Sequence, residues 1–210
     1  MGRVMPGAQL PPDPGLDLAG FPDATLPAGA VVARAHNVTR GEWWFTSGPG
    51  GRFNLDPPLG TWYAADDIET ALREKLRGRV TPGRAVPWDT AVAVAVTTLA
   101  VPTTKRCANC GDRRAVRFGV TRELAAAPFE GYAVSRRWAE AWRGAGFAGV
   151  RYESRFTTAP GPNAWALFGQ AGDAEAPRPE VRSVTPGLAA CLMAGLRVGC
   201  PTLADLTVLT

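Results

Sequence analysis

The sequence has one well-marked centre, Gly50-Gly51-Arg52-Phe53-Asn54, which leads through Trp62-Tyr63-Ala64-Ala65 into residues 66–78. The first segment is a glycine-rich turn that carries an arginine. The second is a short aromatic strand, and the third has the periodicity of a helix. We expect the rest of the chain to complete a site that this region begins.

The helix over 66–78 has recognisable ends and a buried side. Asp66 is expected to cap it, Glu69 completes an approximate capping box, and Gly78 suits its end. Its apolar residues recur at helical spacing and define the buried side: Ile68, Ala71, Leu72 and Leu76.

Glu74 lies off this apolar stripe, close to Thr70 and Arg77. Spacing alone favours a solvated glutamate paired with Arg77 three residues on, a contact worth little. A functional role for Glu74 therefore needs support from elsewhere in the chain.

The composition is that of one globular domain with a substantial core: 210 residues, 46% hydrophobic and 20% charged. No apolar segment follows a basic start, and the apolar run at 187–197 is too short to cross a membrane. We therefore expect a cytoplasmic protein with no membrane contact.

The net charge of +4 is local. Residues 103–117 hold five basic side chains against Asp112, so this segment alone accounts for the charge and the remainder is neutral overall. One basic patch differs from the chain-wide footprint of a nucleic-acid-binding protein, and nucleic acid is not the expected partner.

The chain divides into three parts by composition. Residues 1–28 carry six prolines and are expected to form an irregular arm. Residues 29–170 form the main domain, with 103–117 as a basic insert. Residues 171–210 are a linker followed by a helix and a strand that pack on the domain.

The expected fold class is α+β, because strands and helices mix without regular alternation. The patterns predict strands at 30–36, 61–65, 89–101, 149–154, 164–168 and 203–209. Besides the helix at 66–78, they predict helices at 121–127, from Ser135 through Trp138 and Trp142, and at 188–197.

Several catalytic machines are excluded. The single histidine, His36, rules out an HExxH zinc site, and neither a phosphate-binding loop ending in Gly-Lys-Ser/Thr nor a GxSxG elbow is present. Residues 144–149 match GxGxxG, but they end a helix and begin a strand, the reverse of the dinucleotide fingerprint.

The four cysteines do not form a convincing metal site. Cys107 and Cys110 have zinc-ligand spacing, but Cys191 and Cys200 lie apart in a hydrophobic context. We expect a surface loop at 107–110, buried free thiols at 191 and 200, and no metal.

Three pieces of the sequence, in order, resemble the RES-domain family, which is named for an arginine, a glutamate and a serine. The first is Val32-Ala33-Arg34. The second is Gly51-Arg52-Phe53-Asn54, followed by Tyr63-Ala64 and Ala71-Leu72-Arg73-Glu74. The third is residues 146–155, followed by Asn163 and Leu167-Phe168. The resemblance covers about residues 31–169, and the order of the pieces, not the helix spacing, marks Glu74 as a site residue.

The resemblance implies a compact fold similar to ADP-ribosyltransferases, with a mixed sheet, flanking helices and NAD as the substrate. Many relatives are toxins of bacterial toxin–antitoxin pairs, so a cognate antitoxin is the implied partner. They deplete NAD by hydrolysis or phosphorolysis, or transfer ADP-ribose to a protein. The resemblance implies that Arg34, Tyr63, Glu74 and Ser154 lie in the site, with Arg52 nearby.

These residue types suit the chemistry. Cleavage of the nicotinamide–ribose bond develops positive charge on the ribose, which a carboxylate such as Glu74 stabilises. Arg34 and Arg52 can each bind pyrophosphate oxygens. Tyr63 offers a ring to nicotinamide and a hydroxyl to ribose, and Ser154 a hydrogen bond to either.

Each assignment has a structural alternative. Arg34 could be a strand-edge charge, Tyr63 a core aromatic and Ser154 a turn residue. His36 shares the strand face of Arg34 and either contacts ribose or is a satisfied structural histidine. Strand alternation points Glu153 away from the face of Ser154.

The chain departs from the family pattern in places. Ala35 stands where some relatives have an aromatic residue, so either Trp44 or Phe53 completes the ring sandwich or the sandwich is weaker. The tail from residue 183 lies outside the resemblance and either covers the core or forms a self-association surface. The insert at 103–117 leaves a third hypothesis open, a non-catalytic module that binds nucleic acid or an acidic protein.

Overall fold

The computed structural model describes residues 9–77, 84–157, 161, 163–173 and 177–200. Its strands are β1 (Asp23–Leu26), β2 (Val31–Asn37), β3 (Trp44–Phe45), β4 (Leu59–Ala65), β5 (Val94–Ala100), β6 (Lys105–Asn109), β7 (Gly149–Glu153), β8 (Asn163–Gln170), β9 (Gly172–Asp173) and β10 (Glu180–Pro186). Its α-helices are α1 (Ile68–Leu76), α2 (Trp88–Val92), α3 (Arg122–Ala126), α4 (Tyr132–Gly144) and α5 (Gly187–Met193). Short 3₁₀ helices lie at Arg113–Phe118 and Phe129–Gly131.

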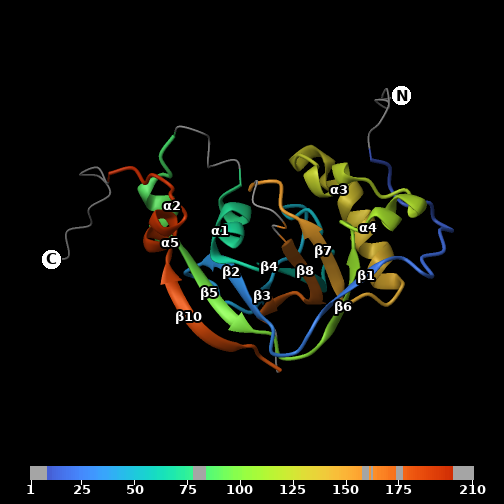
Figure 1. Ribbon diagram of the computed structural model, residues 1–210, viewed down its shortest axis with the longest axis horizontal. Coiled ribbons are helices and arrows are strands. Elements are labelled where there is room, and N and C mark those ends of the chain that lie inside the picture. Colours follow the sequence, from blue (N-terminus) through green and yellow to red (C-terminus); the bar gives the residue numbers. More distant parts are fainter. Residues whose placement is uncertain (1–8, 78–83, 158–160, 162, 174–176, 201–210) are drawn as a thin grey trace.

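Eight strands form one curved mixed sheet in the order β1-β6-β7-β8-β4-β2-β5-β10, and β3 pairs with β9 in a separate two-stranded ribbon. Only the β6–β7 pair of the eight-stranded sheet is parallel. Figure 1 shows α1 beside the middle of the sheet, with α2 and α5 at one end and α3 and α4 at the other. The α+β fold with a mixed sheet and flanking helices, predicted from the sequence, is confirmed.

Helix α1 begins one residue later than predicted. Asp67, not Asp66, is the N-cap, and its Oδ1 accepts from the backbone nitrogen of Thr70 at 2.7 Å. Asp66 instead accepts from the indole nitrogen of Trp165 at 2.7 Å, which ties the start of α1 to β8. The predicted apolar side is correct, since α1 buries Leu72 and Leu76 against the sheet. Each such leucine stabilises the fold by about 1.5–3 kcal/mol.

The middle of the sheet is buried on both faces. One core lies between the sheet and the helices and includes Leu72 and Trp142. The other lies under the β3–β9 ribbon, where Trp43 contacts Trp62 at 4.9 Å between ring centroids. Because side chains alternate along β4, Trp62 faces the ribbon and Tyr63 faces the helices.

The predicted strand at 89–101 is wrong over its first residues. Helix α2 occupies Trp88–Val92, and β5 begins only at Val94. Pro87 precedes the helix and Asp89 lies in its first turn, which are both helix-start signals. The alternation of Ala and Val suits a strand, but Ala91 is buried in the helix.

The basic segment at 103–117 is not an insert. Its β6 lies inside the sheet, antiparallel to β1 and parallel to β7. Cys107 and Cys110 are buried rather than in a surface loop, and burial raises the pKa of Cys107 to about 12. Cys191 is buried as predicted, whereas Cys200 is exposed, contrary to the prediction.

The amino-terminal segment is more ordered than predicted. β1 extends the sheet, and Phe21 packs against Phe118, Trp142 and Phe147 with ring centroids 5.0–6.0 Å apart. The many prolines of this segment favoured an irregular arm, and nothing in its sequence indicated these apolar contacts. The prediction of an irregular arm is therefore wrong for the described residues around 21–26.

The carboxy-terminal segment also joins the fold. β10 pairs along β5, and α5 packs on α1 and α2. The predicted helix at 188–197 corresponds to α5, while the predicted strand at 203–209 lies outside the described residues. Ser135, predicted as a helix cap, lies inside α4 and donates to the Leu124 carbonyl at 3.3 Å. Within the part of the chain that is described, no helix has the length and apolar character needed to cross a membrane.

Candidate functional site

A cavity of about 180 Å³ opens where β2 and β4 separate. β2 pairs with β5 along its whole length but with β4 only at Ala33 and Ala65. The cavity is lined by β2, the glycine-rich loop, β4, α1, the start of α4 and β7. Its lining residues of chemical interest are Arg34, His36, Arg40, Trp44, Arg52, Asn54, Tyr63, Glu74, Arg77, Tyr132 and Tyr152.

Arg34 occupies the gap between the two strands. Its Nη1 donates to the Tyr63 carbonyl at 3.1 Å and its Nη2 to the Trp44 carbonyl at 2.6 Å. The guanidinium lies over the Trp62 ring, 5.2 Å from its centroid. These contacts pair the Tyr63 and Trp44 carbonyls with the guanidinium and tie β2 to β4 and β3.

The glycine-rich loop is fastened to β4 and presents Arg52. The Tyr63 hydroxyl accepts from the Phe53 backbone nitrogen at 2.9 Å and donates to Asn54 Oδ1 at 3.0 Å. A Cβ at Gly51 would lie 2.1 Å from the same Asn54 oxygen, so only glycine fits there. The Arg52 guanidinium then lies 5.5 Å from the Tyr132 ring and 5.6 Å from the Tyr152 ring.

Glu74 projects from α1 toward β7. Its Oε2 accepts from the Tyr152 hydroxyl at 3.4 Å. The predicted pairing with Arg77 is wrong. Among the described residues no ion pair includes Glu74, and Arg77 instead donates to the Gly50 carbonyl at 2.8 Å.

The cavity contains polar atoms without partners. Six buried side-chain nitrogen or oxygen atoms of the described residues lack a hydrogen bond, and three belong to cavity residues: Arg34 Nε, Arg52 Nε and Glu74 Oε1. A buried polar atom left unpaired costs about 1–3 kcal/mol. Two donors and one acceptor on residues that line the cavity thus lack partners in the protein.

Arg34 carries a further cost. Burial lowers the pKa of its guanidinium to about 9, and the nearby charge of Glu42 acts in the opposite direction. The charged form is therefore poorly solvated at this buried position. An anion bound there relieves this cost.

The remaining predicted residues fall in different places. His36 lines the cavity, but its Nδ1 donates to the Arg40 carbonyl at 2.9 Å and its Nε2 faces the Thr97 hydroxyl at 2.9 Å. Ser154 is buried and is not among the lining residues, and its hydroxyl accepts from the Phe156 backbone nitrogen at 3.2 Å. Five of the six predicted site residues thus line one cavity, and Ser154 lies outside its lining.

Of the two rings proposed to replace an aromatic at Ala35, only Trp44 lines the cavity, because Phe53 is fully buried. Tyr132 and Tyr152 also line the cavity but were not predicted as site residues. Tyr152 could have been predicted, since strand alternation places it on the same face of β7 as Ser154. Tyr132 could not, because it reaches the cavity from the start of α4, which is distant in the sequence.

The family assignment rests on a match of the RES domain model to residues 31–186, about three quarters of the chain. The chain belongs to the RES domain family. This RES domain includes β10 within its matched range, beyond the limit of 169 drawn from the motifs. No curated protein matches the sequence significantly.

One solved structure supports the fold independently. A chain of the M. tuberculosis MbcT–MbcA toxin–antitoxin complex matches this RES domain with a TM-score of 0.57 at 17% identity. The match covers 82% of this chain and 91% of that chain. At this identity the likeness concerns the fold.

Proposed function

We propose that this RES domain is a toxin-type enzyme that consumes NAD by cleaving the bond between nicotinamide and ribose. The observation that carries the proposal is the unpaired Glu74 Oε1 in a cavity that also holds the unpaired Nε atoms of Arg34 and Arg52. The Glu74 carboxylate and the Arg34 and Arg52 guanidinium groups match the charges of NAD. NAD has a cationic nicotinamide riboside, which a carboxylate attracts, and a pyrophosphate, which guanidinium groups bind.

In the reaction the C1′–N bond breaks and its electron pair passes to nicotinamide, which leaves uncharged. The ribose gains oxocarbenium character, and the Glu74 carboxylate stabilises that charge. An oxygen of water or phosphate bonds to C1′ and releases its proton to solvent. Glu74 is held for this role by the Tyr152 hydroxyl.

Arg34 and Arg52 bind the pyrophosphate. Both are buried cavity-lining residues, and each has a buried Nε donor without a partner, so an anion would supply the hydrogen bond that each lacks. Tyr63 fastens the loop that carries Arg52 and offers its ring to the ligand. Burial raises the pKa of its hydroxyl, which therefore stays uncharged.

Ser154 acts on the site indirectly. It does not line the cavity, and its hydroxyl fixes the backbone after β7 by accepting from the Phe156 nitrogen. His36 holds the turn that carries Arg40. Both are proposed as site residues, with an indirect effect on NAD. No metal is assigned a part.

The partner is proposed by analogy with the structural neighbour, which is part of a toxin–antitoxin complex. We propose a cognate antitoxin that blocks the cavity, and we place the enzyme in the cytoplasm, where NAD is available. The basic segment at 103–117 is not proposed as a binding site. Its Arg114 is paired with Asp112 at 2.7 Å, and its Arg106 covers the Phe147 ring at 4.3 Å.

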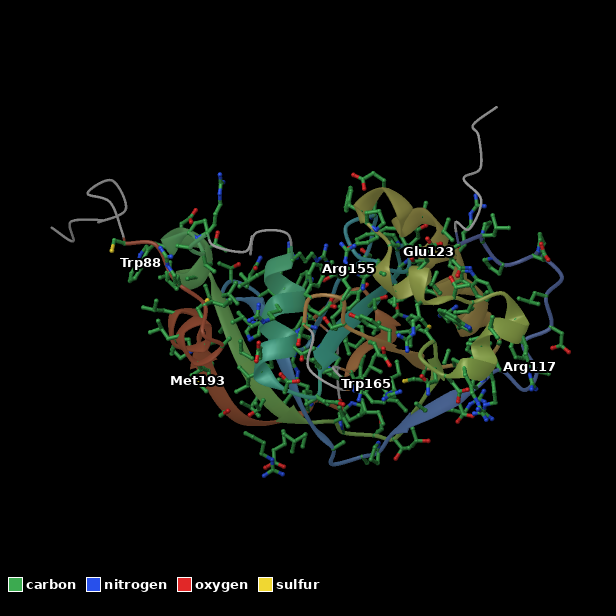
Figure 2. All side chains as sticks on the ribbon, turned by 45° about the horizontal axis from the view of Figure 1, so that its top comes forward. Trp88, Arg117, Glu123, Arg155, Trp165 and Met193 are labelled. Carbon is green, nitrogen blue, oxygen red and sulfur yellow. The ribbon has the colours of Figure 1, made fainter. Side chains whose placement is uncertain are left out.

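The test is nicotinamide release from NAD by the purified chain, with and without phosphate. We expect Glu74→Ala to reduce release by at least about 100-fold while the protein stays folded. Glu123→Ala, which removes an exposed carboxylate on α3 far from α1, should leave release unchanged (Figure 2). Release by wild type that survives Glu74→Ala would remove Glu74 from the mechanism.

The same assay separates the acceptors. A requirement for phosphate would indicate a phosphorylase, and release without phosphate a glycohydrolase. Transfer of ADP-ribose to a protein uses the same bond cleavage. If a protein is the acceptor, NAD labelled in its adenine would label a protein band. Absence of both release and labelling would overturn the proposal.

A further inference from the structure

Trp44 differs from the other tryptophans of the chain. Five of the seven are buried, each 5% exposed or less: Trp43, Trp62, Trp138, Trp142 and Trp165. Trp44 is half-buried and lines the cavity. The other half-buried tryptophan, Trp88, lies on α2 and does not line the cavity.

Arg40 lies against the same ring. Its guanidinium is 5.3 Å from the Trp44 ring centroid, and Arg40 is exposed and also lines the cavity. A guanidinium over an indole is a pair of flat groups that can accept a third flat ring by stacking. Since Arg40 is exposed, moving its side chain breaks no buried contact.

The backbone beneath this pair is held firmly. His36 Nδ1 donates to the Arg40 carbonyl, and Arg34 Nη2 donates to the Trp44 carbonyl. Trp44 also pairs with Asp173 in the β3–β9 ribbon. The two side chains are therefore free to adjust on a backbone that is already positioned.

The cavity has a direction. Glu74 is bonded to Tyr152, and Arg52 lies beside Tyr152; Arg34 bonds both the Tyr63 and the Trp44 carbonyls. Glu74 and Arg52 thus meet at Tyr152, whereas Arg34 is bonded to the backbone of Trp44, beside the Arg40–Trp44 pair. NAD likewise joins its pyrophosphate to nicotinamide riboside on one side and to adenosine on the other.

We propose that Trp44 and Arg40 form the adenine subsite, in which the purine stacks on the Trp44 indole and the Arg40 guanidinium covers its other face. The inference rests on the proposed function, because that function places the nicotinamide end at Glu74. It predicts that the site selects adenine dinucleotides over ligands that offer only phosphate.

The test is direct binding, measured by calorimetry on the full chain, of ADP-ribose and of inorganic pyrophosphate. Neither probe carries nicotinamide, so neither is cleaved. Trp44→Ala should weaken ADP-ribose about tenfold and leave pyrophosphate unchanged. Trp44→Phe should restore most of the loss, because phenylalanine keeps a stacking face.

Arg40→Ala should weaken ADP-ribose about threefold beyond any loss of pyrophosphate affinity. Trp88→Ala and Arg117→Ala are the matched controls, because neither residue lines the cavity and the two lie toward opposite ends of the molecule (Figure 2). Both controls should bind ADP-ribose as wild type does.

Equal losses of ADP-ribose and pyrophosphate in a folded Trp44→Ala protein would overturn the subsite, as would an unchanged affinity for ADP-ribose. So would a wild-type protein that binds ADP-ribose no better than pyrophosphate. Failure of the proposed function shows separately, as absent nicotinamide release from NAD by a wild-type protein that still binds ADP-ribose.

Discussion

The Tyr152 hydroxyl donates to Oε2 of Glu74 at 3.4 Å and leaves Oε1 without a partner. The two residues come from β7 and α1, and both line the cavity. Burial, and then the charge of Glu74, raises the pKa of Tyr152. The tyrosine hydroxyl therefore keeps its proton and remains a donor at neutral pH.

Tyr152→Phe should lower kcat for nicotinamide release about fivefold and change KM little, because the lost bond orients Glu74 and does not hold the substrate. The ring packing against Phe53, with centroids 5.1 Å apart, is kept. Steady-state kinetics with a thermal melt checks this. A rise in KM with an unchanged kcat would show that Tyr152 contacts the substrate instead.

Neighbouring glycines in the loop should respond differently to alanine. A Cβ at Gly51 meets Asn54 Oδ1 at 2.1 Å, whereas a Cβ at Gly50 meets nothing within 4 Å. Gly51→Ala should displace Asn54, loosen the loop from Tyr63 and destabilise the fold by about 1–3 kcal/mol. Activity should fall because Arg52 is carried by the same loop.

Gly50→Ala is the matched control for stability, and its free energy of unfolding should equal that of wild type. Urea unfolding and nicotinamide release measure both effects. Equal behaviour of the two variants would contradict the tight contact between Gly51 and Asn54.

Anion binding should weaken as the pH rises through about 9. The folded-state pKa of Arg34 is lowered to about 9 by burial, so the guanidinium is charged below this pH and loses its proton above it. Binding of ADP-ribose then requires uptake of a proton, and the logarithm of its affinity should fall by up to about one per pH unit.

Calorimetry of ADP-ribose binding from pH 7 to 10.5 measures this effect, because the phosphates of ADP-ribose do not titrate in this range, whereas inorganic pyrophosphate does. Arg34→Gln should bind more weakly at pH 7 and lose the step near pH 9. A step of the same size in the variant would assign the titration to another group.

The linked effect on folding has the opposite sign. An unfolded Arg34 keeps its proton to a higher pH than the folded one, so its desolvation cost is full below pH 9 and is relieved above it. Urea unfolding should show this as a contribution of Arg34 to the free energy of unfolding that rises above pH 9 and is absent in Arg34→Gln.

The four cysteines should divide into one reactive and three protected thiols. Cys200 is exposed, whereas Cys107, Cys110 and Cys191 are buried, and burial raises the pKa of each buried thiol. A thiol reagent should therefore modify one cysteine rapidly in the native chain and four after denaturation. Cys200→Ser should remove the fast reaction, and fast labelling that persists would show that a buried thiol is accessible.

The local elements could be predicted because their patterns are local. The apolar spacing of α1 and the alternation in β2, β4, β7 and β8 hold in the structure, with shifts of one or two residues at the ends. The predicted start of α1 was off by one residue because two neighbouring aspartates could each cap the helix; Asp67 does so, and Asp66 binds Trp165. The prediction of a strand failed at Trp88–Val92, where the alternation of small apolar residues is compatible with a helix as well.

The resemblance of three ordered motifs to the RES-domain family was enough to mark Arg34, Arg52, Tyr63 and Glu74, and these four line one cavity. Tertiary structure was needed to show that the Tyr63 hydroxyl bonds the loop, that Ser154 is not among the residues that line the cavity, and that Tyr152 donates a hydrogen bond to Glu74. The cavity itself exists because β2 and β4 part beyond Ala33, with Arg34 bonding carbonyls of two other segments. That separation depends on contacts between residues distant in the chain, and such contacts leave no periodicity in a sequence.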